Sequence, residues 1–586
     1  MRKIVRVLTV VAGVAGGTAA CSDALSVPNK NNPGTDQVLK RPSDVEQLLG
    51  TGYNTVHQGT LGTAIVVSGA GVNDNVQNQL QVLALENYSS LANFGMGPRG
   101  GLPRNPIQNY RNNPVASGNF RDFSTLERVA RSAADGIARF NEAGFTTGDS
   151  ARDMRARAFG YFVMGTALGN LALVYDSLAV VSPATPPAQV TPFVGYAEGM
   201  KTALLYLDTA LVIASKPGAD KAYPLPSGWV NGNTLKQDEF KRLIRSYRAR
   251  FRAGVARTPV ERQAADWTAI IDDAENGLKA DLNIQMDPSI GWQMAWPIQH
   301  NAYGSWHQMT PYIIGMADTS HAPDMVPFKT INFEEWLTKP ISAKTPESFL
   351  IRTPDRRFPA GDDRATQLTS SGGESDDVVP PNGQYFRNRA SGKDVFDGTW
   401  GNSPYDFARF RAFFNNKRIG PYPVMTRAEL RLLAAEGYIY KGNLATAAVK
   451  IDSSRTANQL PSVAGISSLA TPVPGAVYTK DATTGKAVLV AADPAASNCV
   501  PRVPLPAGGT ACGNIFEAMK WEKRMETAYT GYGAWYFDSR GWGDLPQGTA
   551  LSFPVPYQEM DARAEPAYSL GGLGGTAAAL LGTYGY

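Results

Sequence analysis

The segment Thr426–Leu460, TRAELRLLAAEGYIYKGNLATAAVKIDSSRTANQL, decides the fold class. In both of its halves, apolar and small residues recur three or four positions apart, which is typical of one face of a helix. They are Leu430, Leu433, Ala434 and Tyr438 in the first half, and Leu444, Ala447, Ala448 and Ile451 in the second. Gly442 suits the left-handed residue that ends a helix, and Asn443 suits the cap of the next one. We therefore expect two antiparallel helices between residues 426 and 457.

Similar helical patterns occur earlier in the chain. They cover residues 155–175, 193–214, 240–255 and 260–278. Each helical hairpin must bury its apolar face against a neighbour, but the period of the patterns is irregular. We therefore predict a mostly α fold, a degenerate tetratricopeptide-like scaffold of helical hairpins with long loop-rich insertions.

Short motifs predict where several helices begin. Four of them fit the capping box, in which a hydroxyl accepts a backbone N–H and an acid reaches back to the cap. They are Ser43-x-x-Glu46, Ser124-x-x-Glu127, Thr258-Pro259-Val260-Glu261 and Thr426-x-x-Glu429. Thr191-Pro192 and Thr258-Pro259 also place proline at the first helical position, where its missing N–H costs nothing. We expect a helix to begin at each motif.

Two long segments, residues 280–425 and 462–513, are dense in Gly, Pro, Asp and aromatic residues. Loops of this length inside a compact domain are usually functional or disordered. Apolar runs on both sides of Thr483-Thr484-Gly485 predict a hairpin of strands between residues 476 and 490. The Gly/Ala-rich tail, residues 569–586, is expected to be frayed.

The N-terminal region has the features of a secretion signal. Three basic residues precede an apolar run, residues 7–14, and a stretch of small residues, 16–20. The apolar run is much shorter than the roughly 18 residues that a membrane span requires. We therefore predict a signal peptide over residues 1–20.

Cys21 follows in the pattern Thr18-Ala19-Ala20-Cys21, which resembles a bacterial lipobox with Thr18 in place of the usual Leu. This resemblance implies that Cys21 is lipidated and becomes the first mature residue. The polar residues 21–40 then form a tether between membrane and fold. The alternative is ordinary cleavage after Ala20 with a free thiol.

The other two cysteines, Cys499 and Cys512, share one loop. In a chain predicted to be exported, disulfides persist. We interpret the two residues as a disulfide pair, and a pair of free thiols stays open as the alternative.

The net charge of +4 at pH 7 falls to +1 without residues 1–20, which carry three basic and no acidic residues. A chain so close to neutrality has no overall field that attracts nucleic acid. Basic clusters such as Lys241-Arg242 lie at helical spacing and are typical of a solvated helix face. We expect no nucleic-acid partner.

Common catalytic signatures are absent from the sequence, namely G-x-x-x-x-G-K-[ST], H-E-x-x-H and G-x-S-x-G. His300, His307, Asp318 and His321 lack the spacing of metal ligands. The acidic runs within residues 361–377 lack the spacing of a calcium loop. We predict no catalytic residue, no metal and no cofactor.

The window Ile290–Tyr312, IGWQMAWPIQHNAYGSWHQMTPY, is the richest in aromatic rings beside amides. Capture of a sugar needs flat apolar faces with hydrogen-bonding side chains around them. The candidate ligand-binding residues are Trp292, Trp296, Tyr303, Trp306 and Tyr312, with Asn87, Tyr88 and Asn93 in a second, weaker patch. In the alternative interpretation these rings fill the core beneath a long loop.

Several segments, in this order along the chain, resemble the SusD/RagB family. Residues 428–460 are similar to its helix–Gly–helix segment, and the shorter elements Arg155–Tyr161 and Pro354–Arg357 precede them. Ile515–Trp542, IFEAMKWEKRMETAYTGYGAWYFDSRGW, resembles its charged helix and Trp/Phe-Asp-x-Arg-x-Trp motif. Phe553–Met560, FPVPYQEM, is similar to its closing Pro-x-Pro-x-x-Glu.

The resemblance spans roughly residues 21–568 and implies one SusD-like domain over residues 41–568, with an insert at 462–513. It also implies that the aromatic residues between 529 and 542 pack in the core. Ion pairs are expected to lock the charged helix to the helical stack. The residues expected to form them are Glu522, Arg524, Glu526, Asp538 and Arg540.

The family consists of outer-membrane lipoproteins that capture oligosaccharides or related nutrients and hand them to a TonB-dependent, SusC-like barrel. The resemblance implies a non-catalytic, lipid-anchored binder that faces the cell exterior. Two other functions stay open. One is a secreted glycan hydrolase with an unrecognised carboxylate pair, for instance among the acids of residues 355–377. The other is a helical-repeat adaptor that binds only another protein.

Overall fold

A computed structural model describes most of the chain. The described residues are 38–62, 75–88, 96–102, 104–113, 116–294, 309–320, 331–339, 349–381, 383–390, 403–483 and 485–568. The predicted signal peptide, most of the tether and the tail expected to fray lie outside them. None of the described helices combines the length and the hydropathy that a bilayer span requires.

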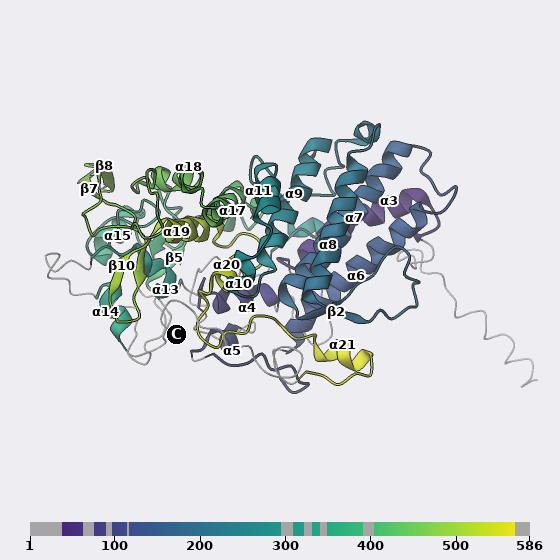
Figure 1. The fold of residues 1–586 in the computed structure, drawn as a ribbon, viewed down its shortest axis with the longest axis horizontal. Helices are drawn as coiled ribbons and strands as arrows, with labels where there is room; N and C mark the ends of the chain where they lie inside the picture. The colour runs from purple at the N-terminus through teal and green to yellow at the C-terminus, as the bar shows by residue number, and fades with distance from the viewer. Residues whose placement is uncertain are drawn as a thin grey trace, which may run out of the picture.

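Helices make up the body of the molecule, so the prediction of a mostly α fold is confirmed. One end of the stack consists of α3 (Pro42–Gln58), α6 (Ala116–Phe140), α7 (Ser150–Val174), α8 (Tyr196–Ala214) and α9 (Gln237–Gly254). Figure 1 shows these helices packed together, and each consecutive pair from α6 to α9 is in contact. The other end consists of α11 (Trp267–Glu275), α17 (Arg427–Tyr440), α18 (Leu444–Arg455) and α19 (Ile515–Thr527), and α11 joins α9 to α17. The result is the degenerate tetratricopeptide-like stack of hairpins that the sequence predicts.

Shorter elements lie in the loop-rich segments and at the ends of the stack. Further α-helices are α4 (Val76–Leu83), α5 (Met96–Gly100), α10 (Pro259–Gln263), α13 (Pro311–Ile314), α14 (Phe333–Thr338), α15 (Arg364–Ser370), α16 (Arg411–Asn415), α20 (Ala534–Trp542) and α21 (Tyr557–Ala562). Short 3-10 helices are η1 (Ala219–Ala222), η2 (Pro288–Ile290), η4 (Gly315–Ala317) and η7 (Thr456–Asn458).

Strands among the described residues pair only as two-stranded antiparallel ribbons. The ribbons are β1 (Ser177–Ala179) with β2 (Phe193–Gly195), β3 (Leu282–Met286) with β6 (Gly420–Met425), β4 (Phe386–Asn388) with β5 (Tyr405–Phe407), β7 (Gly475–Lys480) with β8 (Ala487–Asp493), and β9 (Arg502–Pro504) with β10 (Thr510–Cys512). The β7–β8 ribbon confirms the predicted hairpin.

Helix α7 is the central helix of the stack. Asp149 caps it by accepting the N–H of Ala151 at 2.9 Å. Its neighbours α3, α6, α8 and α9 cover it, and 19 of its 25 residues are buried. A helix buried on all sides is apolar all round instead of having one apolar stripe, which explains the composition of this segment. Gly169 lets α7 approach the ring of Phe251 on α9.

Several predicted caps are confirmed. The side chains of Thr258, Thr426 and Asn443 each accept the backbone N–H three residues on, at 3.1–3.2 Å. Gly442 has a φ of 73°, in the left-handed region that favours glycine. These short signals are reliable here because each one coincides with the start or end of an apolar stripe.

Other predicted starts are wrong. Helix α3 begins at Pro42, one residue before Ser43, because the proline takes the first helical position. Ser124 lies inside α6, since the helix already runs from Ala116. The residues after Thr191-Pro192 pair with β1 as strand β2, so α8 begins only after Gly195.

Two predicted helices also have different bounds. The helix expected over 260–278 is divided into α10 and α11, because Asp266 caps a new helix by accepting the N–H of Ala269 at 3.0 Å. The helix expected over 155–175 already begins at Ser150.

A substitution in α7 tests the close contact between α7 and α9. A Cβ atom on Gly169 would fall within the ring of Phe251, which is fully buried. We expect Gly169→Ala to lower the free energy of unfolding by ~1–3 kcal/mol, because overpacking forces the two helices apart. Urea unfolding followed by circular dichroism measures the change. Gly228→Ala is the control, since a Cβ atom there meets nothing within 4 Å. Equal stability of the two variants would contradict the contact.

Candidate functional site

The start of the aromatic window is fixed in the core. Trp292 is 4% exposed, and its ring centroid lies 6.4 Å from that of Tyr53 and 5.4 Å from that of His57, both on α3. The Nε2 of His57 donates to the carbonyl of Gln293 at 3.0 Å. Burial lowers the pKa of His57 to about 4, so the imidazole is neutral at pH 7. Trp292 therefore anchors the window to α3, and its ring does not face solvent.

The end of the window is also buried. Tyr312 on α13 is 1% exposed, and its ring packs edge-on against Trp336 of α14 with 4.8 Å between centroids. The three candidate rings between these anchors, Trp296, Tyr303 and Trp306, lie outside the described residues. The structure thus assigns the first and last rings of the window to the core, as the alternative interpretation expects for them.

The second candidate patch, Asn87, Tyr88 and Asn93, also has one residue in the core and one outside the described residues. Asn87 is 1% exposed and its Nδ2 donates to the hydroxyl of Tyr529 at 3.1 Å and to Gln81 at 3.4 Å, so it holds two chain segments together. Tyr88 is partly exposed, which leaves part of its side chain accessible to a ligand. Asn93 lies outside the described residues.

Asn87 belongs to a layer of buried amides, called the amide layer below, that consists of Gln77, Gln79, Gln81 and Asn87. Gln77 accepts the N–H of Gly533 at 2.6 Å. Gln79 accepts from the Nε of Arg99 at 3.0 Å. None of the sequence patterns described above predicts this layer. The signal for it is the run VQNQLQVL, which places amides on several faces of one short helix.

A strained turn lies beside the amide layer. Glu86 is 4% exposed and accepts the N–H of Tyr529 at 2.6 Å. Burial raises the pKa of Glu86 to about 8, although its hydrogen bonds to Tyr529 and Gln81 oppose the rise, so the carboxyl is protonated at pH 7. Leu85 and Tyr529 both have a φ of 58°, which is unfavourable for bulky residues. Strain of this kind persists only where the surroundings hold it, and it collects at functional sites.

The family-like segments meet in a buried charge cluster around Arg357, the Arg357 cluster. Its guanidinium binds Asp355 at 2.7 Å and Glu522 of α19 at 2.9 Å, and all three side chains are fully buried. Ser454 of α18 donates to Glu522 at 2.8 Å, and the indole of Trp521 donates to Asp355 at 3.1 Å. The element at residues 354–357, helix α18 and helix α19 therefore share one set of partners.

A second buried set, the Arg262 cluster, joins α10, α17, α19 and α20. Arg262 binds Glu436 at 2.7 Å and Asp538 at 3.0 Å. Lys523 binds Asp538 at 2.9 Å, and the indole of Trp542 donates to Glu436 at 2.8 Å. This cluster joins the charged helix to the helical stack, as the resemblance implies.

Four of the five predicted ion-pairing residues do form ion pairs. They are Glu522 and Asp538 in the two clusters, Glu526 with Arg409 at 3.2 Å, and Arg524 with Asp544 at 2.5 Å. For Arg540 the prediction is wrong, because its guanidinium donates to the carbonyls of Leu173, Gly254 and Leu551 and pairs with no described carboxylate. Burial, with a contribution from the charge of Arg257, lowers the pKa of Arg540 to about 9.

The acids considered as ligands have structural partners. Asp318 accepts the N–H of Phe333 at 2.7 Å, and Asp363 caps α15 by accepting the N–H of Thr366 at 2.8 Å. Within the described part of the chain, no group of His, Cys, Asp and Glu has the arrangement of a metal site. The candidates His300, His307 and His321 lie outside that part.

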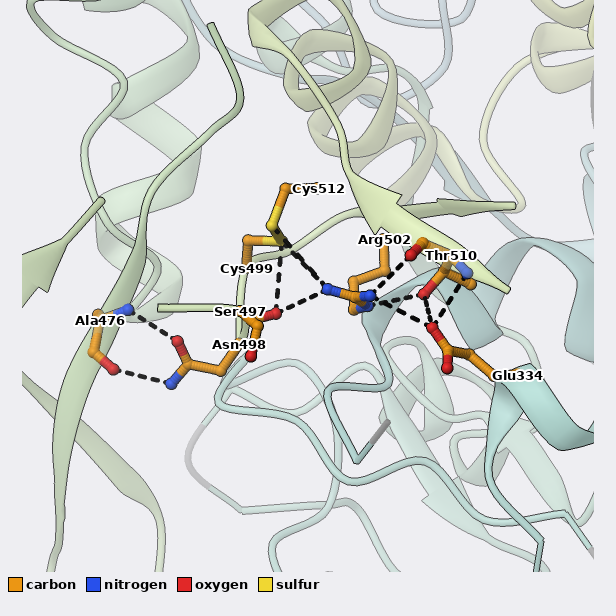
Figure 2. The surroundings of a disulfide bond; sticks show 8 residues. All are labelled: Glu334, Ala476, Ser497, Asn498, Cys499, Arg502, Thr510 and Cys512. Atoms are coloured by element: carbon orange, nitrogen blue, oxygen red, sulfur yellow. Dashed lines mark hydrogen bonds and ion pairs between the residues drawn. A yellow bond between two sulfur atoms is a disulfide. The ribbon is translucent and has the colours of Figure 1, made fainter. Parts of the chain in front are cut away.

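Cys499 and Cys512 are joined by a disulfide at the β9–β10 ribbon (Figure 2). In the same ribbon, Arg502 donates to the hydroxyl of Thr510 at 2.7 Å and to its carbonyl at 2.8 Å. Arg502 also pairs with Glu334 of α14 at 3.2 Å. The ribbon within the predicted insert is thereby attached to the loop-rich part of the fold.

No known family profile matches the chain, and no curated protein sequence does so either. Solved structures of low identity resemble it over most of their length. A SusD-like carbohydrate-binding protein from Bacteroides fragilis is 13% identical with a TM-score of 0.48, over 94% of this chain and 96% of that one. A SusD superfamily protein from Bacteroides thetaiotaomicron is 11% identical with a TM-score of 0.48, over 89% and 98%. Another, from Bacteroides vulgatus, is 12% identical with a TM-score of 0.43, over 89% and 90%.

The protonated state of Glu86 predicts a dependence of stability on pH. The carboxyl keeps its proton to about pH 8 in the folded chain and loses it near pH 4.5 when unfolded. Its contribution to stability is therefore complete below about pH 4.5 and is lost as the pH rises to about 8. Gln mimics the neutral carboxyl, so we expect Glu86→Gln to gain roughly 2–4 kcal/mol relative to the parent chain between pH 5 and pH 8.

Urea unfolding at both pH values measures this difference. Glu335→Gln, which changes an exposed glutamate of α14, is the control. If Glu86→Gln and the parent chain show the same change in stability with pH, Glu86 is ionised in the folded protein.

Proposed function

We propose that this chain is a non-catalytic, lipid-anchored protein of the outer membrane that captures oligosaccharides or related nutrients and passes them to a TonB-dependent, SusC-like barrel. The observation that carries the proposal is that three of the family-like segments contact one another in the fold. Residues 354–357, 428–460 and 515–542 share buried partners in the Arg357 and Arg262 clusters. Motifs that matched a family by chance would not be expected to bind one another.

The ligand is proposed to bind at the aromatic window. Trp292 and Tyr312 fix its two ends in the core, which leaves Trp296, Tyr303 and Trp306 as the candidate contacts, together with Tyr88. Aromatic faces bind the C–H faces of sugar rings, and the amides between them in the sequence supply hydrogen bonds to hydroxyl groups. This combination favours a saccharide over a purely apolar ligand.

Two of the carboxylates that the hydrolase alternative considers have structural roles. Asp355 is fully buried and bound by Arg357 and Trp521, and Asp363 caps a helix. A general acid or base must reach the bond that it cleaves. Both acids have structural roles here, which supports a binding function.

Glycan binding by the soluble chain from residue 22 onward tests the ligand. We expect Trp296→Ala and Trp306→Ala to weaken binding to the recognised glycan at least about tenfold, because buried aromatic contacts dominate binding energy. Tyr110→Ala, which removes a ring that is 46% exposed outside the window, is the control. Binding of peptides and of no glycan would refute the sugar assignment and leave nutrient uptake standing. Turnover of the bound glycan would instead favour the hydrolase.

Mass spectrometry of the protein from its native host tests the anchor. We expect Cys21 to be the first residue and to carry acyl chains, and Cys21→Ser to release the protein from the membrane fraction. The SusC-like barrel should be recovered with the wild-type protein in mild detergent. An unacylated Cys21 together with the absence of any barrel would overturn the proposed location and partner.

A further inference from the structure

A groove of about 910 Å³ lies on the helical stack at the start of α9, and none of the described residues of the aromatic window lines it. Three segments form its walls, namely the turn around Asp220–Pro224, residues 232–239 with Arg242 one turn further on, and residues 278–282. Buried Leu235 and Leu282 also line it. The groove is large enough for several sugar units, since ligand pockets of about 300–1,000 Å³ hold drug-sized molecules.

Most acids in this groove already have partners. Asp238 pairs with Lys241 at 2.7 Å, and the hydrogen bond and charge of Lys241, with a smaller contribution from the charge of Arg242, lower the pKa of Asp238. Glu239 accepts the N–H of Lys236 at 2.8 Å. Asp281 accepts the N–H of Arg427 at 2.8 Å.

Its cations are more available. Arg242 lines the groove, and its guanidinium makes no hydrogen bond or ion pair with any described residue. Lys236 is exposed at the same wall. A guanidinium presents paired N–H donors that match a carboxylate. The groups that remain free to bind a ligand therefore favour one that carries a carboxylate.

An aromatic side chain also lines the groove. Tyr223 is partly exposed, packs on Phe240 with 6.0 Å between centroids, and is followed by Pro224. Its hydroxyl has no hydrogen-bond partner among the described residues. That hydroxyl is itself buried, so it is the ring, which lines the groove, that can pack against the C–H face of a sugar.

An extended peptide fits the groove less well. Peptides commonly bind by adding a strand to a free sheet edge. Strand β3 starts at the groove, but β6 pairs with one of its edges. At Gln285 the N–H is taken by the carbonyl of Asn231 at 3.0 Å, and the Gln285 carbonyl accepts from the Asn231 side chain at 2.5 Å. The strand therefore offers no free edge at this point.

We propose that this groove is a second saccharide site, which binds the carboxylate-bearing unit of an acidic oligosaccharide. Arg242, assisted by Lys236, binds the carboxylate, and Tyr223 contacts the sugar ring. This inference rests on the proposed function and adds a uronate-containing substrate class to it. Strand β3 begins in the groove and is followed by Asp287, whose N–H donates to the Trp292 carbonyl at 2.6 Å. The groove and Trp292, the described start of the aromatic window, therefore lie at opposite ends of strand β3.

Isothermal titration calorimetry of the full chain in detergent tests the groove. The probes are tetramers of galacturonate and mannuronate, a hyaluronan tetrasaccharide, a neutral galactan tetramer and tetraglutamate. We expect at least one uronate oligomer to bind more tightly than the neutral tetramer, with an affinity that falls as salt is raised. Arg242→Gln and Lys236→Gln should each weaken that binding, the first at least about tenfold.

Matched controls are Arg128→Gln and Lys441→Gln, which alter exposed cations elsewhere on the stack, and circular dichroism verifies the fold of every variant. The groove site would be overturned if Arg242→Gln bound the uronate as tightly as the parent chain. It would also be overturned if only Trp296→Ala lost uronate binding. Both results would leave the proposed function intact. Binding of neutral glycans and of no uronate oligomer would also overturn the groove site and leave the proposed function intact. Equal and competitive binding of tetraglutamate would overturn the saccharide assignment of the groove. Failure of every saccharide to bind, also in the glycan-binding experiment on the chain from residue 22 onward, would contradict the proposed function itself.

Discussion

The buried guanidinium of Arg357, held between Asp355 and Glu522, is the constraint on which the rest of the structure depends. All three side chains are fully buried. Removal of one partner from such a group leaves an uncompensated charge in the interior and costs about 3–5 kcal/mol. The chain can therefore place α19 in only one register relative to the loop before α15. Arg262 imposes the same condition between α10, α17 and α20.

The helical scaffold could be predicted from the sequence where local and periodic signals agree. Thr426, Gly442 and Asn443 coincide with the ends of apolar stripes, and the structure confirms all three. At Ser124 a capping motif predicts a helix start that does not occur, because α6 has already begun upstream at Ala116. Central α7 lacks a stripe, so periodicity alone does not locate its start.

The candidate site was harder to predict for a different reason. Trp292 is buried by α3, and Tyr312 by α14, and no local pattern around either ring reports those neighbours. The amide layer could not be predicted from local patterns, because its hydrogen-bond partners, such as Gly533 and Arg99, come from other segments of the chain. The sequence shows which segments are rich in aromatic and amide residues. It therefore locates the aromatic window, but it does not show which of its side chains contact a ligand. The groove at Arg242 is likewise made by three segments that become neighbours only in the fold.

The Cys499–Cys512 bond has a consequence for the unfolded state of the protein. Arg502 holds the same ribbon through Thr510 and Glu334, so polar contacts and a covalent bond both connect its strands. In the chain-entropy account, a bond that closes a 13-residue separation removes conformational freedom from the unfolded chain. The cross-link therefore stabilises the fold mainly by lowering the entropy that the chain would gain on unfolding.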